Sequence, residues 1–317
     1  MAVEAQSGSS LKGLIAAAIV FAAILAFGWL FYAVPEPVGP DGKVQAPVAA
    51  MEEPVIARQP WTFAGMTGHF DQAQLQRGYQ VFEAVCSKCH SADLFAFRNL
   101  GEPGGPAFSE GQVKTLAATA EVDDAPDQDG VVKKRPGRPS DTWQSPYANE
   151  NAARAANGGA LPPDFSVLAK ARGLHAEYPW YMAPVVMGKD ILSGYQEGGP
   201  DYIYAVLNGY LEKPPVDMMG PDGKPMVMAT GMNFNAAFPG HQIAMPQPLK
   251  DGDVPYGDGS PQTLDQYSRD VASFMMWMAE PTLEERKSLG IRVLIYLGIL
   301  SVLLFLAKQI VWSRIKH

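Results

Sequence analysis

The stretch Cys86-Ser87-Lys88-Cys89-His90 decides how the rest of the chain is interpreted. Its C-x-x-C-H spacing is typical of a site at which a c-type haem is attached. Two thiols this close together are able to add to the two vinyl groups on one edge of a porphyrin. The imidazole that directly follows the second thiol is then placed to bind the iron from the proximal side. The sequence therefore predicts one covalent haem c, held through Cys86 and Cys89, with His90 as an iron ligand.

Two other uses of paired cysteines fit this chain less well. A structural zinc site normally takes four protein ligands, and Cys86 and Cys89 are the only 2 cysteines among 317 residues. A thioredoxin-like dithiol is expected within a strand–helix–strand unit, which the pattern around the motif does not indicate. Haem attachment is the interpretation that the local sequence favours.

Two long apolar runs divide the chain. Residues 14–34 carry no charge, and residues 293–307 form a second uncharged run that continues beyond Lys308 to Trp312. Roughly 20 apolar residues are needed to cross the membrane, so the first run suffices alone and the second suffices if Lys308 reaches the interface. We therefore expect a signal or anchor segment (1–34), a Pro- and Ala-rich tether (35–60), a haem domain (61–290) and a C-terminal transmembrane anchor (291–317).

The basic residues predict the orientation in the membrane. The C-terminal end carries Lys308, Arg314 and Lys316 and no acidic residue, and such ends stay in the cytoplasm. Lys12 indicates the same for the N-terminus. Both ends place the haem domain on the periplasmic side of a bacterial inner membrane, where c-type haem is attached. The first apolar run is longer than the usual signal core of about 7–15 residues, so a cleaved signal and a retained anchor both stay open.

Charge restricts the class of partner. The formal net charge of the whole chain is −8, and residues 35–290 hold 32 acidic and 20 basic side chains. A domain of this charge repels nucleic acid and attracts basic proteins. An acidic run over residues 121–129, followed by Lys133, Lys134 and Arg135, is interpreted either as a solvated loop or as a docking surface for such a protein.

Two segments predict the helices that build the domain. Asp71 is a suitable N-cap with Gln74 three residues later, and apolar residues follow at helical spacing: Leu75, Tyr79, Phe82 and Cys86. Gly78 beside them would let a second helix approach closely. The last helix before the anchor is expected over residues 264–279, packed across the first, and a shorter one over residues 201–211.

The sixth iron ligand has several candidates among the 14 methionines and 5 histidines. Met245 stands out because Ile243-Ala244-Met245-Pro246-Gln247-Pro248 is stiffened by two prolines and presents its side chain at little cost in conformational entropy. Thioether sulfur would also raise the reduction potential. The rivals are methionines of the last helix (Met275, Met276, Met278), methionines of a Gly-rich loop (Met218, Met219, Met226, Met228, Met232) and the other histidines (His69, His175, His241, His317).

From about Trp61 onward the chain resembles the cytochrome c1 family. The longest shared run, Ala152-Ala153-Arg154-Ala155-Ala156-Asn157-Gly158-Gly159-Ala160-Leu161-Pro162-Pro163-Asp164, is much more specific than the haem motif. The other shared segments are Leu75-Gln76-Arg77-Gly78-Tyr79-Gln80-Val81-Phe82, Phe97-Arg98-Asn99-Leu100, Arg135-Pro136-Gly137, Phe238-Pro239-Gly240, Ile243-Ala244-Met245-Pro246 and Ala279-Glu280-Pro281.

The resemblance implies a fold and a site. The fold is a mainly α-helical cytochrome c fold with long irregular insertions, of which residues 174–196 look like one of the bacterial kind. The sixth ligand falls in the Phe-Pro-Gly…Met-Pro segment, which matches Met245. Arg135 matches a residue that the family uses near a haem propionate.

The resemblance also implies a function. The protein would carry single electrons from a Rieske iron–sulfur subunit to a soluble basic c-type cytochrome, beside cytochrome b, in the quinol:cytochrome c oxidoreductase of a respiratory or photosynthetic chain. It would be an electron carrier and no enzyme by itself. The alternatives are a haem subunit of a terminal oxidase, a membrane-tethered cytochrome c shuttle, and an enzyme or gas sensor with an open iron site.

Overall fold

The computed structural model describes residues 56–172, 179–193, 198–220 and 223–313. By internal contacts the chain divides into two units, Met1–Glu52 and Glu53–His317, and all described residues belong to the second. The N-terminal apolar segment, most of the tether, part of the 174–196 insertion, and Arg314 and Lys316 therefore lie outside the described residues.

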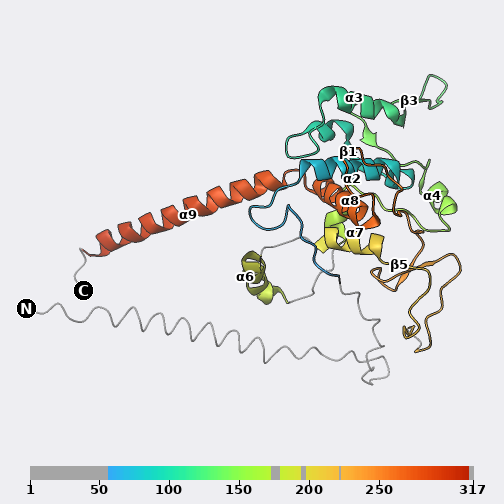
Figure 1. Cartoon of the computed structure of the whole chain (residues 1–317). Coiled ribbons are helices and arrows are strands. Elements are labelled where there is room, and N and C mark those ends of the chain that lie inside the picture. Colours follow the sequence, from blue (N-terminus) through green and yellow to red (C-terminus); the bar gives the residue numbers. More distant parts are fainter. Residues whose placement is uncertain (1–55, 173–178, 194–197, 221–222, 314–317) are drawn as a thin grey trace, which may run out of the picture. The chain divides into compact units, whose positions relative to one another are not determined.

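Helices dominate the described residues, as predicted (Figure 1). The α-helices are α2 (Gln72–Ala84), α3 (Glu110–Thr119), α4 (Glu150–Ala156), α5 (Leu168–Ala171), α6 (Ala183–Ser193), α7 (Gly198–Asn208), α8 (Leu264–Ala279) and α9 (Leu283–Trp312). Short 3₁₀ turns are η1 (Cys86–Lys88), η2 (Phe97–Gly101) and η3 (Trp180–Met182).

The strands are short and antiparallel. They are β1 (Ala92–Ala96), β2 (Glu121–Asp123), β3 (Lys134–Pro136), β4 (Thr142–Trp143), β5 (Tyr210–Leu211), β6 (Asn233–Asn235) and β7 (Gln242–Ile243). They form the pairs β1–β4 and β2–β3 and the three-stranded sheet β5–β6–β7. The mainly α prediction is confirmed, whereas α3, α6 and these small sheets were not predicted.

Helix α2 begins and faces inward as its sequence predicts. The Asp71 carboxylate accepts a hydrogen bond of 2.8 Å from the Gln74 backbone N–H, which satisfies one of the free donors of the first turn. Leu75, Tyr79 and Phe82 are all buried. The apolar stripe of α2 therefore lies in the main core.

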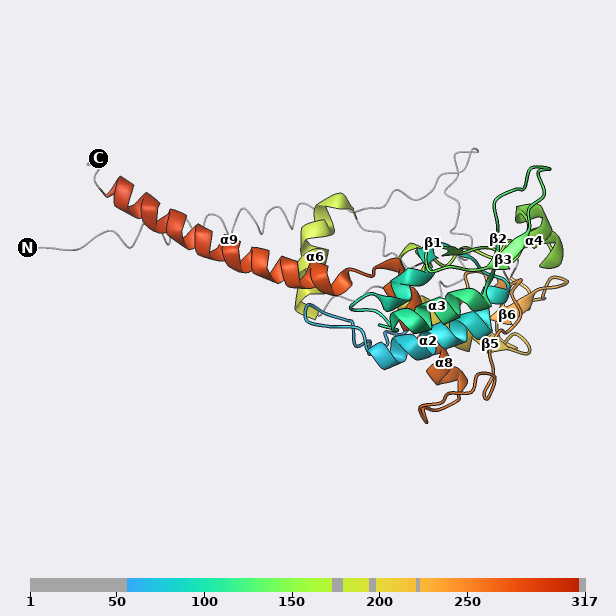
Figure 2. The same cartoon turned by 90° about the horizontal axis from the view of Figure 1, so that it is seen from above.

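The close approach of α2 and α8 is made possible by Gly78. Helix α8 lies directly against α2 (Figure 1) and passes across it in the view from above (Figure 2). A Cβ added at Gly78 would lie 2.1 Å from the Asp270 carbonyl oxygen and 2.6 Å from the Phe274 Cβ. These distances are shorter than van der Waals contact, so only glycine allows this separation of the two backbones. The prediction of a close helix pair at this residue is confirmed.

Helix α8 has the predicted bounds, and it is buried around most of its circumference. Tyr267, Phe274 and Trp277 are almost wholly inaccessible. Helices α5 and α7 also pack on α8.

Helix α7 begins at Gly198 and ends at Asn208. The helix expected over residues 201–211 therefore starts earlier than predicted, and its last residues belong to β5 instead.

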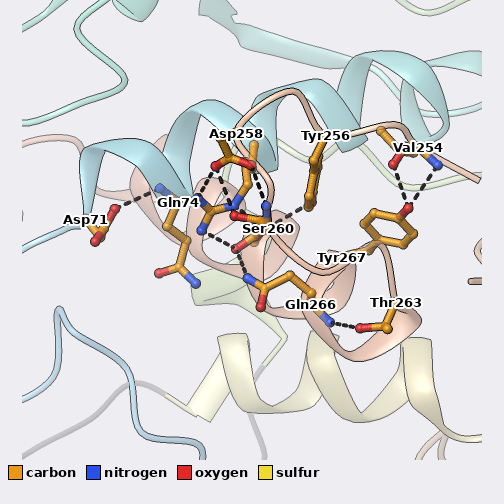
Figure 3. A network of polar contacts seen from close by, with 11 residues as sticks. Asp71, Gln74, Val254, Tyr256, Asp258, Ser260, Thr263, Gln266 and Tyr267 are labelled. Atoms are coloured by element: carbon orange, nitrogen blue, oxygen red, sulfur yellow. Dashed lines mark hydrogen bonds and ion pairs between the residues drawn. The ribbon is translucent and has the colours of Figure 1, made fainter. Parts of the chain in front are cut away.

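Polar contacts fix the irregular segment before α8 (Figure 3). The fully buried carboxylate of Asp270 accepts hydrogen bonds from Arg77 Nε (2.9 Å), Tyr256 Oη (2.9 Å) and Gln266 Nε2 (2.8 Å). Asp258 pairs with the same guanidinium at 2.9 Å. Because a buried carboxylate is costly unless it is paired, this network holds the segment against α2.

Helix α9 follows α8 after a break at Pro281, and within the described residues it is the one helix long and apolar enough to cross a membrane. Its first turn is attached to the domain, since Glu284 accepts from the Phe70 backbone N–H (2.8 Å) and Lys287 donates to the Phe63 carbonyl oxygen. From residue 293 to residue 313 the side chains other than Leu300 are exposed in the isolated chain, as expected of a lipid-facing anchor.

Replacing Gly78 by alanine tests the helix contact. We expect Gly78→Ala to lower the free energy of unfolding by about 1–3 kcal/mol, because the added methyl group overpacks a backbone contact. Gly111→Ala on α3 is the matched control, since a Cβ there meets open space; it should leave stability unchanged or raise it by up to about 1 kcal/mol. Chemical unfolding followed by circular dichroism measures both, and a Gly78→Ala variant as stable as the parent would contradict the contact.

Candidate haem site

The two cysteines of the motif lie on one tight turn directly after α2. The helix ends at Ala84, and the chain tightens into η1, where the N–H groups of Cys89 and His90 both donate to the Cys86 carbonyl oxygen at 3.1 and 3.0 Å. Ser87 Oγ donates to the Glu83 carbonyl oxygen at 2.7 Å. The local hydrogen bonds therefore bring Cys86, Cys89 and His90 to one place.

Both thiols are free and partly accessible. Burial raises the pKa of Cys86 to about 12, so this thiol stays protonated at neutral pH. A reactive redox dithiol normally has a lowered thiol pKa. Cys86 therefore lacks the lowered thiol pKa that is typical of a redox-active dithiol.

A second segment packs against the motif, and we call the two together the proximal clip (residues 90–94 and 163–166). The Nδ1 of His90 donates to the Pro163 carbonyl oxygen at 2.8 Å. The Phe165 backbone N–H donates to the Ser91 carbonyl oxygen at 2.8 Å, and the Leu94 N–H donates to Ser166 Oγ at 3.0 Å. Residues separated by about 70 positions in the chain thus form one hydrogen-bonded unit.

The orientation of His90 suits an iron ligand. Because a carbonyl oxygen only accepts, the bond to Pro163 leaves the proton on Nδ1 and a lone pair on Nε2. Burial lowers the pKa of His90, which keeps the imidazole neutral as metal binding requires. The ring also stacks on Phe165, with centroids 4.1 Å apart.

Asp164 is the centre of the proximal clip. Its carboxylate accepts from Ser91 Oγ (2.7 Å), the Asp93 N–H (2.8 Å) and the Ser166 N–H (2.8 Å). Partial burial opposes the charge, but these hydrogen bonds outweigh it and lower the pKa of Asp164. The sequence carried no signal for which carbonyl or carboxylate would face the motif.

Met245 lies on a different element from the motif. It follows β7, is half-buried, and packs against a separate apolar cluster of Val206, Ala237 and Ile243. Tyr210 Oη donates to its carbonyl oxygen at 3.1 Å. The backbone that presents Met245 is therefore held in place.

Asn235 fixes the segment that leads to β7. Its Nδ2 donates to the Val206 carbonyl oxygen at 2.7 Å, and its Oδ1 accepts from the Ala237 N–H at 3.0 Å. These bonds tie the chain before Met245 to the end of α7.

The structure gives several rival ligands other roles. Met275, Met276 and Met278 are buried in α8 as core residues, as expected. His241 is buried and stacks on Phe234, and its Nδ1 lies 3.3 Å from the Asn235 carbonyl oxygen. His175 and His317 lie outside the described residues. The assignment of Met245 stays a prediction.

The acidic run is part of an ion-paired hairpin rather than a free loop. Strands β2 and β3 pair, and side chains of the strands and their connecting loop form the bridges Asp123–Lys134 (2.6 Å), Asp127–Lys133 (2.9 Å) and Asp124–Arg135 (3.2 Å). Arg135 also pairs with Asp141, which follows the hairpin (2.6 Å). These contacts favour a structural role for most of the run. They also occupy the guanidinium of Arg135, whose place near a propionate stays a prediction.

Comparison with known proteins confirms the resemblance seen in the sequence. The Cytochrome C1 family model matches residues 61–315. The chain is 47% identical over 253 residues to a cytochrome b/c1 of Bradyrhizobium diazoefficiens, a match covering 80% of this chain but 35% of that protein, so the chain spans about a third of its length. It is 42% identical over 269 residues to cytochrome c1 of Rhodospirillum rubrum (83% of this chain, 89% of that protein). It is 45% identical over 260 residues to cytochrome c1 of Blastochloris viridis (81% and 86%).

Replacing Asp164 tests the proximal clip. Asp164→Asn removes the charge that three donors satisfy, so we expect it to lower the free energy of unfolding by about 1–3 kcal/mol at pH 7. Because the folded-state pKa is lowered from the ordinary 3.8, this contribution is complete above that value and is lost as pH falls through the folded pKa. Unfolding curves at pH 7 and pH 3 measure the difference between variant and parent, which should shrink at pH 3.

Asp93→Asn is the matched control. Asp93 is largely exposed, and partial desolvation of its carboxylate together with the charge of Asp164 raises its pKa. Its neutralisation should therefore leave the free energy of unfolding unchanged or slightly raise it at pH 7. Equal losses in the two variants would show that Asp164 has no special role.

Proposed function

Because the chain belongs to the cytochrome c1 family, we propose that it is the haem subunit of a quinol:cytochrome c oxidoreductase. In this role it receives single electrons from a Rieske iron–sulfur subunit, beside cytochrome b, and passes them to a soluble c-type cytochrome. The observation that supports it most is the proximal clip, which holds His90 in one tautomer next to two free thiols. The protein is an electron carrier and breaks no substrate bond.

The residues of the motif fit the haem c that this family carries. Cys86 and Cys89 provide the thiols for covalent attachment, and His90 provides the free Nε2 for the iron. When bound, the haem iron alternates between ferric and ferrous states and so supplies the one-electron chemistry. The protein orients the ligand, excludes water and sets the potential.

We assign Met245 as the second iron ligand. The hydrogen bond from Tyr210 and the proline at 246 restrict its backbone, so little conformational entropy is lost when its thioether binds. The sequence around it matches the family segment that carries this ligand.

The location follows from the anchor. Helix α9 is long and apolar enough to cross a membrane, and its basic C-terminal end would stay in the cytoplasm. The haem domain would then face the periplasm of a bacterial inner membrane. Its excess of acidic residues favours a basic soluble cytochrome as the electron acceptor.

The variant Met245→Leu tests the ligand and the function together. The haem should remain attached through the cysteines, while the midpoint potential falls by on the order of 100 mV, since thioether ligation favours ferrous iron. Quinol:cytochrome c reductase activity of the membranes should fall with it. Met219→Leu is the control because that side chain is 55% exposed in a loop. An unchanged potential in Met245→Leu would reject Met245 as the ligand.

Salt dependence tests the acceptor. If a basic cytochrome docks on the acidic domain, its reduction rate should fall as ionic strength rises through about 0.1 M. The triple variant Asp123→Asn/Asp124→Asn/Asp127→Asn should slow the reaction most at low salt, and Lys133→Gln/Lys134→Gln should accelerate it. Stopped-flow measurements with the purified complex give these rates. If the reduction rate changed neither with ionic strength nor between the parent and the charge variants, docking by charge would be contradicted. The hairpin would then have a structural role alone.

A further inference from the structure

We propose that Phe165 is a positioning residue of the haem site, which fixes the plane of the His90 imidazole by stacking on its face. The inference rests on the proposed ligation of the iron by His90. It assigns a role to a side chain that the haem motif does not contain and that lies 75 residues beyond His90.

The contact between the two rings is close and buried. Their centroids are 4.1 Å apart and their planes differ by 28°, a stacked arrangement. Each residue is only 8% exposed. Stacking on a face leaves the ring edge, and thus Nε2, available, so Phe165 constrains the imidazole without competing for its lone pair.

Phe165 itself is held by one contact of its backbone and one of its ring. Its backbone N–H donates to the Ser91 carbonyl oxygen at 2.8 Å, next to His90. Its ring also contacts Phe82 of α2 in a tilted arrangement, with ring centroids 6.1 Å apart. The order His90, Phe165, Phe82 therefore connects the imidazole to the core of the α2–α8 pair.

The stack supplies a constraint that the hydrogen bond of His90 lacks. The bond from Nδ1 to the Pro163 carbonyl oxygen fixes the tautomer and one point of the ring. A single hydrogen bond still permits the ring to tilt about that point, whereas a flat neighbour on one face restricts the tilt. Residues that orient a metal-binding histidine in this way tune the properties of the metal centre.

The test is the electron paramagnetic resonance spectrum of the oxidised full-length protein in detergent, because low-spin ferric signals depend on the orientation of the axial imidazole. Phe165→Leu keeps an apolar side chain but removes the flat ring, so its low-spin signal should broaden and shift. Phe165→Tyr keeps the ring and should restore the parent line positions. Phe95→Leu is the matched control, since Phe95 is a buried core aromatic that makes edge-to-face contacts with Phe274 and Trp277 and none with His90 among the ring contacts of the described residues; its signal should equal that of the parent.

A Phe165→Leu spectrum that superimposes on the parent would overturn the inference, as would an equal change in Phe95→Leu. A parent protein whose spectrum does not show low-spin ferric haem with one imidazole ligand would instead overturn the ligation by His90, and the inference with it. The two failures are therefore distinguishable from the parent spectrum alone.

Discussion

The backbone contact between α2 and α8 at Gly78 is the constraint on which the rest of the structure depends. It sets the position of α2, and the haem motif continues directly from the end of that helix. The core aromatics of α8, among them Phe274, then lie against Tyr79 and Phe82 and fill the space beside the motif.

Long irregular segments are held by carboxylates that each satisfy several donors. Asp270 fixes the segment before α8, and Asp164 fixes the segment that faces His90. A paired carboxylate of this kind favours one conformation of its segment. A different conformation would leave the buried charge or several of its hydrogen-bond donors without a partner, which costs free energy. Hydrogen-bonded side chains thus do here what backbone ladders do in a sheet.

The sequence predicted the elements whose signals are local. The Asp71 cap, the apolar spacing of α2, the bounds of α8 and the apolar length of α9 each follow from neighbouring residues, and the structure confirms them. The sequence did not predict the proximal clip, the β2–β3 hairpin or the early start of α7. The clip joins residues about 70 positions apart, and the bridges of the hairpin depend on strand register, so no local pattern encodes either one.

The role proposed for this chain, the haem subunit of a quinol:cytochrome c oxidoreductase, requires that it be assembled with other redox subunits. The subunit composition of the full-length protein after mild detergent extraction, with the haem spectrum of the same sample, tests it most directly. We predict that a b-type cytochrome and an iron–sulfur protein accompany the chain, in a sample with one c-type haem per copy. An oxidase core in their place, or a chain that is purified alone with its haem, would contradict the account.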